Sequence, residues 1–133
     1  MARGLEVFAG SARLTRSVLA AGLAMWHPID CLYNGGAFDS NIDSRLLQHL
    51  ISWLWLAPPC GTFSALRNLD RGGPLRPKGN PTGDEAVEEV RWGNLLWLRA
   101  LELAWMAWKL GIPFFLEQLR GSKAWLWKDS QAL

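Results

Sequence analysis

Cys60 is the residue whose sequence surroundings best suit chemistry. It follows the apolar run Trp53 to Ala57 and the pair Pro58 and Pro59, and it precedes Gly61. Such a run predicts a short buried strand, and the prolines must end it because they cannot continue a central ladder. A thiolate just beyond such a strand lies where open α/β sheets bind ligands, and it could act as a nucleophile. Most free cysteines are instead small buried hydrophobic side chains, and composition alone favours that interpretation.

Glu117 is the second candidate, because it also follows a short apolar run. Pro113 to Leu116 predicts another buried strand, with Glu117 and Gln118 directly after it. The carboxyl ends of parallel strands share one edge of the sheet, so we expect Glu117 in the same cleft as Cys60. The alternative is a solvent-facing acid at a strand end, which is common.

A glycine turn follows the first apolar run of the chain. Leu5 to Phe8 leads into Ala9, Gly10 and Ser11, and apolar residues then recur at helical spacing from Leu14 to Leu23. This predicts strand, turn and helix, in which Gly10 permits the tight turn and the amides at the helix start face a ligand. Any βα unit needs such a turn, so the pattern alone is weak.

Two acids follow this unit at defined places. Leu23 to Ile29 predicts a second strand with Asp30 at its end, where an acid commonly accepts hydrogen bonds from ribose hydroxyls. A solvated loop acid is an equally good interpretation. Asp43 with Ser44 predicts the cap of a short helix over 44–51.

The segment 65–83 is long, polar and basic. Its charged residues are Arg67, Arg71, Arg76, Lys78 and Asp70. Loops of this length are usually functional or disordered. We expect either a basic flap that grips phosphates, or a mobile solvated loop, and ordering on binding would reconcile the two.

The longest helix is predicted over 84–110. Asp84 suits its N-cap, and Gly111 ends it. Apolar residues recur at three- and four-residue spacing, which assigns the stripe Trp97, Trp105 and Trp108 to the core rather than to a binding platform.

Composition limits the class of protein. The 133 residues make one domain, and 50% hydrophobic residues supply a core. A net charge of +2 gives no global attraction to nucleic acid, so any basic surface is local. Nine tryptophans exceed normal usage and suggest aromatic surface meant for a partner or for a further part of the chain.

The cysteines and histidines form no metal pattern. Cys31 and Cys60 are not part of a Cys-x-x-Cys pair, and His27 and His49 lack metal-ligand spacing, so we expect no metal. A reducing, intracellular compartment is the default for such a chain. The stretch 46–66 has no charged residue, but its prolines, glycine and polar side chains argue against a membrane span.

Three motifs in this chain resemble those of the DNA (cytosine-5) methyltransferase family. The first is the catalytic loop, Pro-Pro-Cys-Gln-x-Phe-Ser. Pro58, Pro59, Cys60, Phe63 and Ser64 match it, whereas Gly61 replaces the glutamine. The second is the Asp-x-Phe-x-Gly opening of the cofactor motif, which Glu6-Val7-Phe8-Ala9-Gly10 resembles. The third is Glu-Asn-Val, read here as Glu117-Gln118-Leu119. Their order fits the family over nearly the whole chain.

The resemblance implies an α/β fold with a mostly parallel, Rossmann-like methyltransferase sheet and helices on both faces. Residues 1–133 would be a partial catalytic domain, incomplete at the C-terminus, because no Arg-x-Arg motif or target-recognition domain is visible. The implied cofactor is S-adenosyl-L-methionine. Its implied binding residues are Phe8 against the adenine, Gly10 at the amino-acid end, Ala9, Ser11, Asp30, Asp39 and Pro58. Ala12 replaces a second glycine of the pattern, which predicts weak binding.

The same resemblance implies a mechanism. Cys60 would attack C6 of a flipped-out cytosine, and Glu117 would hydrogen-bond the base. The cations of segment 65–83 would hold the nucleic-acid backbone, DNA more than RNA. The alternative is a non-catalytic fragment or degenerate copy that acts as a binding module. A partner chain that completes the fold fits either hypothesis.

Overall fold

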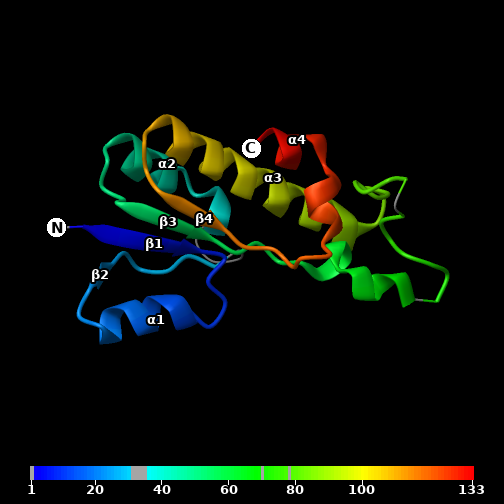
Figure 1. Cartoon of the computed structure of the whole chain (residues 1–133), viewed down its shortest axis with the longest axis horizontal. Coiled ribbons are helices and arrows are strands. Elements are labelled where there is room, and N and C mark those ends of the chain that lie inside the picture. The colour runs from blue at the N-terminus through cyan, green and yellow to red at the C-terminus, as the bar shows by residue number, and fades with distance from the viewer. Residues whose placement is uncertain (1, 31–35, 70, 78) are drawn as a thin grey trace.

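Four short apolar segments pair into one parallel sheet in the part of the chain that the structure describes (Figure 1). The structure is a computed structural model, and it describes residues 2–30, 36–69, 71–77 and 79–133. The strands are β1 (Arg3–Val7), β2 (Ala24–Met25), β3 (Trp53–Leu56) and β4 (Phe114–Leu116). They lie in the order β2-β1-β3-β4, and every pair is parallel. This confirms the parallel α/β sheet that the sequence predicts.

The second strand is shorter than the predicted span 23–29. Trp26 N–H still donates to the Gly4 carbonyl at 2.9 Å, and Ile29 N–H donates to the Glu6 carbonyl at 3.0 Å. Pro28 lies between these bonds and has no N–H to give, so the ladder is interrupted. Pairing resumes as a single parallel bridge between Val7 and Ile29.

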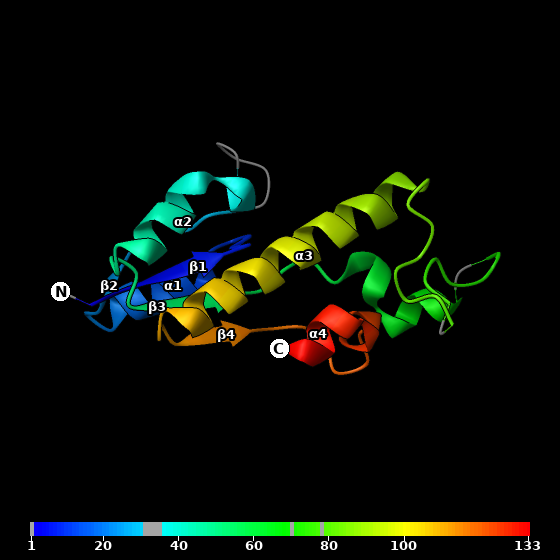
Figure 2. The same ribbon diagram turned by 90° about the horizontal axis from the view of Figure 1, so that it is seen from above.

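Helices cover both faces of the sheet, as expected. They are α1 (Arg13–Ala20), α2 (Ser40–Leu47), α3 (Glu88–Lys109) and α4 (Lys128–Ala132). In Figure 1, α1 lies below the sheet, whereas α2 and α3 lie above it. Figure 2 shows α3 running lengthwise past β3 and β4 and reaching beyond their carboxyl ends. The long helix thus backs both the sheet and the segments that leave it.

Strand alternation divides the side chains between the two faces. Leu5 and Leu54 are register partners, as are Val7 and Leu56, and all four are fully buried. They form the main core with residues of α2 and α3, including Leu46 and Leu103. A second cluster beyond the strand ends contains Phe63, Trp97, Leu101, Ala124 and Trp127. This second cluster supports the loop that carries Cys60.

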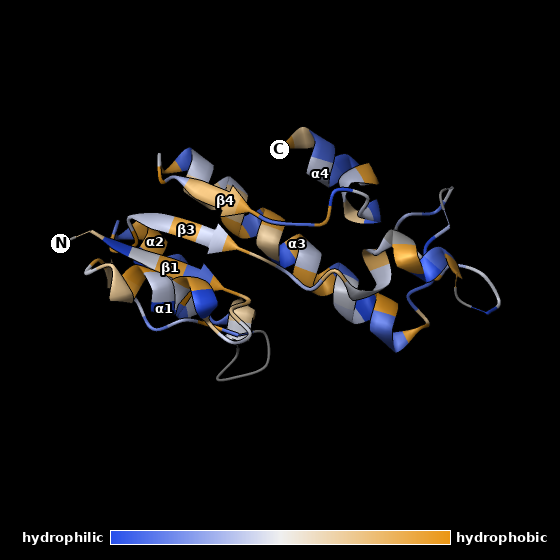
Figure 3. Cartoon of the chain, turned by 60° about the horizontal axis from the view of Figure 1, so that its bottom comes forward, coloured by the Kyte–Doolittle hydropathy of each residue, from blue (hydrophilic) through white to orange (hydrophobic). Residues whose placement is uncertain are grey.

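The opposite face of β3 and β4 lacks a covering helix. Glu6, Trp55 and Phe115 are register partners on that face, and Thr15 of α1 hydrogen-bonds Glu6. The Trp55 and Phe115 rings stack at 5.2 Å, and Phe115 remains 51% exposed. In Figure 3 the strand β4, coloured as hydrophobic, lies at the edge of the sheet, away from α1. This edge is therefore an exposed aromatic surface.

Two helix boundaries differ from the sequence predictions. The N-cap of α2 is Asp39, whose Oδ1 accepts from Asn41 N–H at 2.9 Å, so the predicted cap at Asp43 is wrong. Asp43 instead pairs with Arg99 of α3 at 2.8 Å. The long helix α3 begins at Glu88, because Asp84 closes a separate turn by accepting from Ala86 N–H at 2.9 Å.

Trp108 is also misassigned by the periodicity. Trp97 is fully buried, but Trp108 is 68% exposed near the C-terminal end of α3. Its indole lines an open hollow at the surface with Phe114 and Phe115 of the edge strand β4. The predicted helical spacing of apolar residues is correct. The sequence does not show how far along α3 the core extends.

Glu6 fixes the start of α1. Its buried carboxylate accepts from the N–H and the hydroxyl of Thr15, at 2.7 and 2.6 Å. Thr15 is the third residue of α1, and the preceding Ala12 makes no side-chain cap bond. A negative charge at a helix N-terminus is favourable, and here it comes from the neighbouring strand. Because the Thr15 amide is used in this way, it is not available to a ligand, contrary to the expectation for the helix start.

We predict that Glu6→Gln lowers the free energy of unfolding by about 1 kcal/mol, since it removes the charge that caps α1. Urea unfolding followed by circular dichroism measures the change. The matched control is Glu88→Gln, the same substitution at an exposed first-turn position of α3. Equal effects for the two variants would contradict the capping role.

Candidate functional site

The strand order places a topological switch point between β1 and β3. The chain leaves β1 for β2 on one side and returns to β3 on the other, so the connections diverge at the carboxyl ends of β1 and β3. Ligands of open α/β sheets bind at such a point. The residues just past these two ends are Phe8 to Gly10 and Pro58 to Cys60. Sequence motifs and topology thus select the same edge.

Cys60 and Glu117 line one cleft at this edge. The cleft has a volume of about 280 Å³, and its walls come from Ala57, Pro58, Pro59, Cys60, Glu117, Gln118 and Leu119. This is below the usual range for drug-sized ligands and suits a small ring. The expected juxtaposition of Cys60 and Glu117 is therefore found, because β3 and β4 are parallel neighbours.

The loop after Cys60 is tightly hydrogen-bonded. The Cys60 carbonyl accepts from Phe63 N–H at 2.8 Å and from Ser64 N–H at 3.0 Å, around the 3₁₀ turn η2 (Gly61–Phe63). Thr62 and Phe63 point inward and are buried, whereas Cys60 is half-buried. A Cβ on Gly61 would approach only Glu89, at 3.8 Å. The position that carries glutamine in the resembling family therefore has room for a side chain.

Glu117 is held from two sides. Its N–H donates to the Leu56 carbonyl at 2.8 Å, which continues the β3–β4 pairing past the strand end. Its carboxylate accepts from Trp55 Nε1 at 3.2 Å, and the Trp55 indole is itself stacked on Phe115. The role of Trp55 was missed from the sequence. Alternation could have revealed it, because Phe115 and Glu117 share a face of one strand and Trp55 pairs with Phe115.

The glycine turn has an unusual backbone. Phe8, Gly10 and Ala12 all have positive φ, at 64°, 51° and 55°. Such a value is an outlier for a bulky residue, and strained backbone of this kind gathers at functional sites. No atom lies within 4 Å of a Cβ built on Gly10. The turn therefore has open backbone at Gly10, at the switch point of the sheet.

Asp30 meets this turn, as expected for an acid at the end of the second strand. Its Oδ1 accepts from Gly10 N–H at 3.4 Å, and Ala9 N–H donates to the neighbouring Ile29 carbonyl at 3.0 Å. Ser11 is exposed beside them. Phe8 is only 7% exposed and belongs to the main core, so its contact with an adenine stays a prediction. Asp39 lies elsewhere, as the cap of α2, and its adenine contact also stays a prediction.

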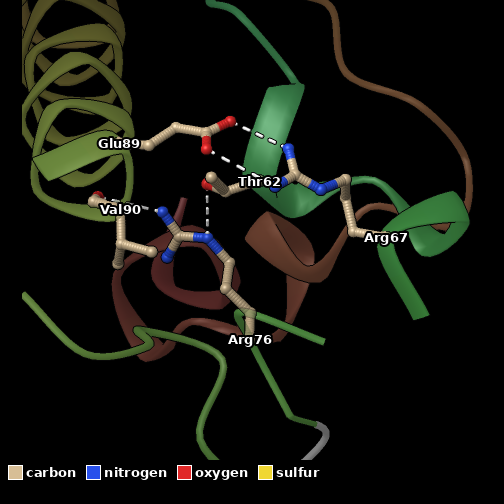
Figure 4. A network of polar contacts seen from close by, with 5 residues as sticks. All are labelled: Thr62, Arg67, Arg76, Glu89 and Val90. Atoms are coloured by element: carbon tan, nitrogen blue, oxygen red, sulfur yellow. Dashed lines mark hydrogen bonds and ion pairs between the residues drawn. The ribbon is translucent and has the colours of Figure 1, made fainter. Parts of the chain in front are cut away.

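Arg76 does not belong to a phosphate-binding surface. Its side chain is fully buried, and its guanidinium donates to Thr62 Oγ1 at 2.8 Å and to the Val90 carbonyl at 3.1 Å (Figure 4). Nη1 donates to Asn94 Oδ1 at 2.6 Å. Nη1 also donates to the carbonyls of Pro81 and Thr82, both at 3.1 Å. The prediction that Arg76 contacts nucleic acid is therefore wrong.

The other predicted cations differ in their surroundings. Arg67 pairs with Glu89 through both nitrogens, at 2.8 and 3.4 Å (Figure 4). Arg71 is exposed. Lys78 lies outside the described residues, as does Cys31. The segment 71–77 is thus anchored by Arg76, not free as a flap would be.

Burial changes the acidity of Arg76. Desolvation lowers the pKa of its guanidinium to about 10, and the negative charges of Glu85 and Glu89 partly oppose that shift. The group still carries its charge at neutral pH. A cation–π contact also stabilises the charged form, because the guanidinium carbon of Arg76 lies 3.6 Å from the centroid of the Phe63 ring. A buried cation therefore fixes the inner side of the Cys60 loop.

Comparisons with known proteins identify no relative. The chain matches no protein-family model, no curated protein and no solved structure. Among the described residues, no group of three or more His, Cys, Asp or Glu side chains could hold a metal ion. No helix in the described ranges is long and apolar enough to cross a membrane. What the fold and site define is a parallel α/β domain with a cysteine–glutamate cleft at the carboxyl edge of its sheet.

Gly93 tests the packing around Arg76. A Cβ at this helical position would lie 2.9 Å from Arg76 Nη2 and 3.1 Å from Thr62 Oγ1. Alanine normally stabilises a helix relative to glycine. We predict that Gly93→Ala instead destabilises the protein by about 1–3 kcal/mol through overpacking.

Urea unfolding measures this effect, with Gly79→Ala as the control in open space. The control should stay within about 0.5 kcal/mol of the parent. A stabilised Gly93→Ala variant would mean that α3 does not approach the Arg76 network as described.

Proposed function

We propose that this chain is an S-adenosylmethionine-dependent methyltransferase that acts on C5 of cytosine in nucleic acid. The observation that carries the proposal is the shared cleft of Cys60 and Glu117, next to the switch point at the ends of β1 and β3. A nucleophile and a hydrogen-bonding acid lie on one side, and an open glycine turn lies on the other. The sequence resemblance assigns the same residues to the same roles.

The turn after β1 fits S-adenosylmethionine in its general features. The open space beside Gly10 would admit the ligand backbone closely, and Asp30 at the same turn supplies a carboxylate suited to ribose hydroxyls. Phe8 and Pro58 are buried apolar residues at the ends of adjacent strands. When bound, the cofactor supplies the methyl group, attached to a positively charged sulfur.

The chain's own residues would perform the remaining chemistry. Cys60 Sγ bonds to C6 of the base, and the ring electrons move to C5, which becomes the nucleophile for the methyl group. Glu117 hydrogen-bonds the base and stabilises the electron-rich ring. The C5 proton then passes to solvent, the C5–H electrons re-form the C5–C6 double bond, and Cys60 Sγ leaves as the thiolate. The half-buried position of Cys60 limits its access to solvent while leaving it open to the cleft.

One observation favours a second candidate, a non-catalytic fragment or degenerate methyltransferase-like binding module. Two of the predicted phosphate contacts already have internal partners, since Arg76 is buried and Arg67 pairs with Glu89. Weaker contacts to the phosphates of a nucleic acid would suit a degenerate copy that keeps the fold but has little or no catalytic activity. The covalent adduct described below separates the two.

A substitution at Gly10 tests cofactor binding. We predict that Gly10→Asn weakens S-adenosylmethionine binding at least about tenfold, since the added side chain fills the open space beside the turn. Asparagine tolerates positive φ, so the backbone is preserved. Titration calorimetry measures the affinity.

The control for this variant is Gly22→Asn. Gly22 also has positive φ and open surroundings, but it follows α1 at the other edge of the sheet. This control should leave the affinity unchanged. If both variants bind the cofactor as the parent does, the assignment of the turn is wrong.

A substitution at Cys60 tests catalysis. An oligonucleotide with 5-fluorocytosine cannot lose a C5 proton, so a productive enzyme remains covalently attached. We predict a denaturation-resistant adduct with the parent chain and none with Cys60→Ser, because the hydroxyl is a far weaker nucleophile. Glu117→Gln should slow adduct formation by about 10²-fold or more through lost charge stabilisation.

The matched control is Cys31→Ser, which changes the other cysteine of the chain. It should form the adduct normally. A parent chain that binds cofactor and oligonucleotide but forms no adduct would exclude the enzyme in favour of the binding module.

A further inference from the structure

The edge strand β4 directs part of its backbone away from the sheet. The Pro113 carbonyl and the Glu117 N–H both bond to β3, at 2.9 and 2.8 Å. Because backbone direction alternates along a strand, Phe115 also faces β3, whereas the N–H and C=O groups of Phe114 and Leu116 face away from it. Within the described residues β4 is the last strand of the sheet, so these outward groups have no strand beside them. An exposed edge of this kind is a template for another strand.

This edge lacks the usual protection against pairing. Proteins commonly block an exposed edge with a charged side chain or a proline. The sequence of β4 is Phe-Phe-Leu, and the adjacent Pro113 faces β3, so it does not block the outer side. An apolar hollow of about 720 Å³ is lined by Phe114 and Phe115 of this strand, by Trp108 of α3 and by Leu133 after α4. None of the described side chains that line this hollow is charged.

A second copy of β4 has the complementary arrangement of backbone groups. In an antiparallel pair centred on Phe115, Phe114 of each copy lies opposite Leu116 of the other. Both residues direct an N–H and a C=O outward, so each opposed pair exchanges two hydrogen bonds. Phe115 then lies opposite Phe115 of the second copy in a non-hydrogen-bonded pair, with Cβ atoms about 4.5–5.5 Å apart. A single two-fold axis therefore satisfies all the outward backbone groups of β4.

The aromatic side chains follow the same symmetry. Phe115 stacks on Trp55 at 5.2 Å, on the face of the sheet that no helix covers at β3 and β4. Pairing at Phe115 would continue this stack into a row of four rings, two from each copy. Aromatic pairs attract one another in addition to the area that they bury. Because the side chains around the hollow carry no charge, two identical surfaces can meet there without repulsion.

The exposed apolar area suits a weak dimer. A large aromatic side chain can bury about 150–250 Å². Trp108 is 68% exposed and Phe115 is 51% exposed, so much of that area remains accessible. With the other apolar residues of the hollow, each copy offers on the order of 500 Å². Two copies then reach the roughly 1,000 Å² that a specific interface needs, which predicts reversible association in the micromolar range rather than an obligate dimer.

We propose that two copies of this chain form a homodimer through antiparallel pairing of their β4 strands about a two-fold axis at Phe115. The pairing joins the two four-stranded sheets into one. The occupant of the edge is a second copy because one register satisfies the outward backbone groups and aligns the aromatic rings at the same time. This inference does not depend on the proposed function.

Sedimentation equilibrium of the full chain tests the dimer. We expect a reversible monomer–dimer equilibrium between about 1 and 200 µM, as suits an interface of this size. Phe115→Lys should weaken association at least about tenfold, because like charges would lie directly opposite each other. The control is Phe38→Lys, the same change at another exposed phenylalanine, which precedes the N-cap of α2. It should associate as the parent does.

A mixture of two charged variants tests the register. Phe115→Glu alone should also be monomeric, whereas an equimolar mixture of Phe115→Glu and Phe115→Lys should associate, because opposite charges then lie face to face. Sedimentation velocity with one variant fluorescently labelled detects the mixed dimer. Urea unfolding midpoints show whether each variant is folded on its own.

Hydrogen exchange measured by NMR tests the backbone pairing. The amides of Phe114 and Leu116 should become more protected as the protein concentration rises. The amide of Glu117 is already bonded to β3 and should not change. Constant exchange at Phe114 and Leu116 in a sample that dimerises would exclude pairing through β4.

The remaining outcomes also decide the proposal. A monomer over the whole concentration range overturns it and leaves this edge to a strand of another protein. A dimer that Phe115→Lys does not weaken uses a different surface. If both charged variants are folded but do not associate when mixed, the two-fold pairing at Phe115 is wrong.

Discussion

The guanidinium of Arg76 lies where three segments meet: the loop after Cys60, the residues Pro81 and Thr82, and the start of α3. Burying a charge costs several kcal/mol unless it is well paired, and here the hydrogen bonds and the Phe63 ring offset that cost. Removal of one acceptor would leave an N–H of this buried cation with fewer partners, which is costly, so the contacts hold the segments together. The Cys60 loop therefore takes its position from a packed network rather than from its own short 3₁₀ turn.

Much of the fold and of the candidate site could be predicted from local patterns. Apolar runs that end at Pro58 or begin at Pro113 locate two strands, because proline cannot extend a ladder. Parallel pairing then requires their carboxyl ends to share an edge, which brings Cys60 and Glu117 together. The contact of Gly10 with Asp30 follows in the same way from β1 and β2. The chemical roles of these residues are a separate matter that the fold does not test.

The misplaced features depend on packing between distant segments. Arginine is rarely buried, so the burial of Arg76 could not be predicted from its neighbours in the sequence. Its hydrogen-bond acceptors come from residues 62, 81, 82, 90 and 94. Asp39 and Asp43 are both good caps, and the pairing of Asp43 with Arg99 of α3 decides between them. Trp108 fits the helical period, but it lies beside the edge strand β4 at the surface and not over the core. Tertiary contacts override local preference in each case.

Strand spacing limits what kind of reaction this edge can support. Neighbouring strands lie about 4.8 Å apart, so the ends of β1 and β3 are one spacing apart and those of β1 and β4 about 10 Å apart. A ligand held at the Gly10 turn and a ring held between Cys60 and Glu117 would therefore lie in adjoining sites. Direct transfer of a small group needs reacting atoms within about 3–3.5 Å, which adjoining sites permit and separated ones do not. The rigid Arg76 network behind Thr62 matters for the same reason, since a loop free to shift by an ångström would lose that alignment.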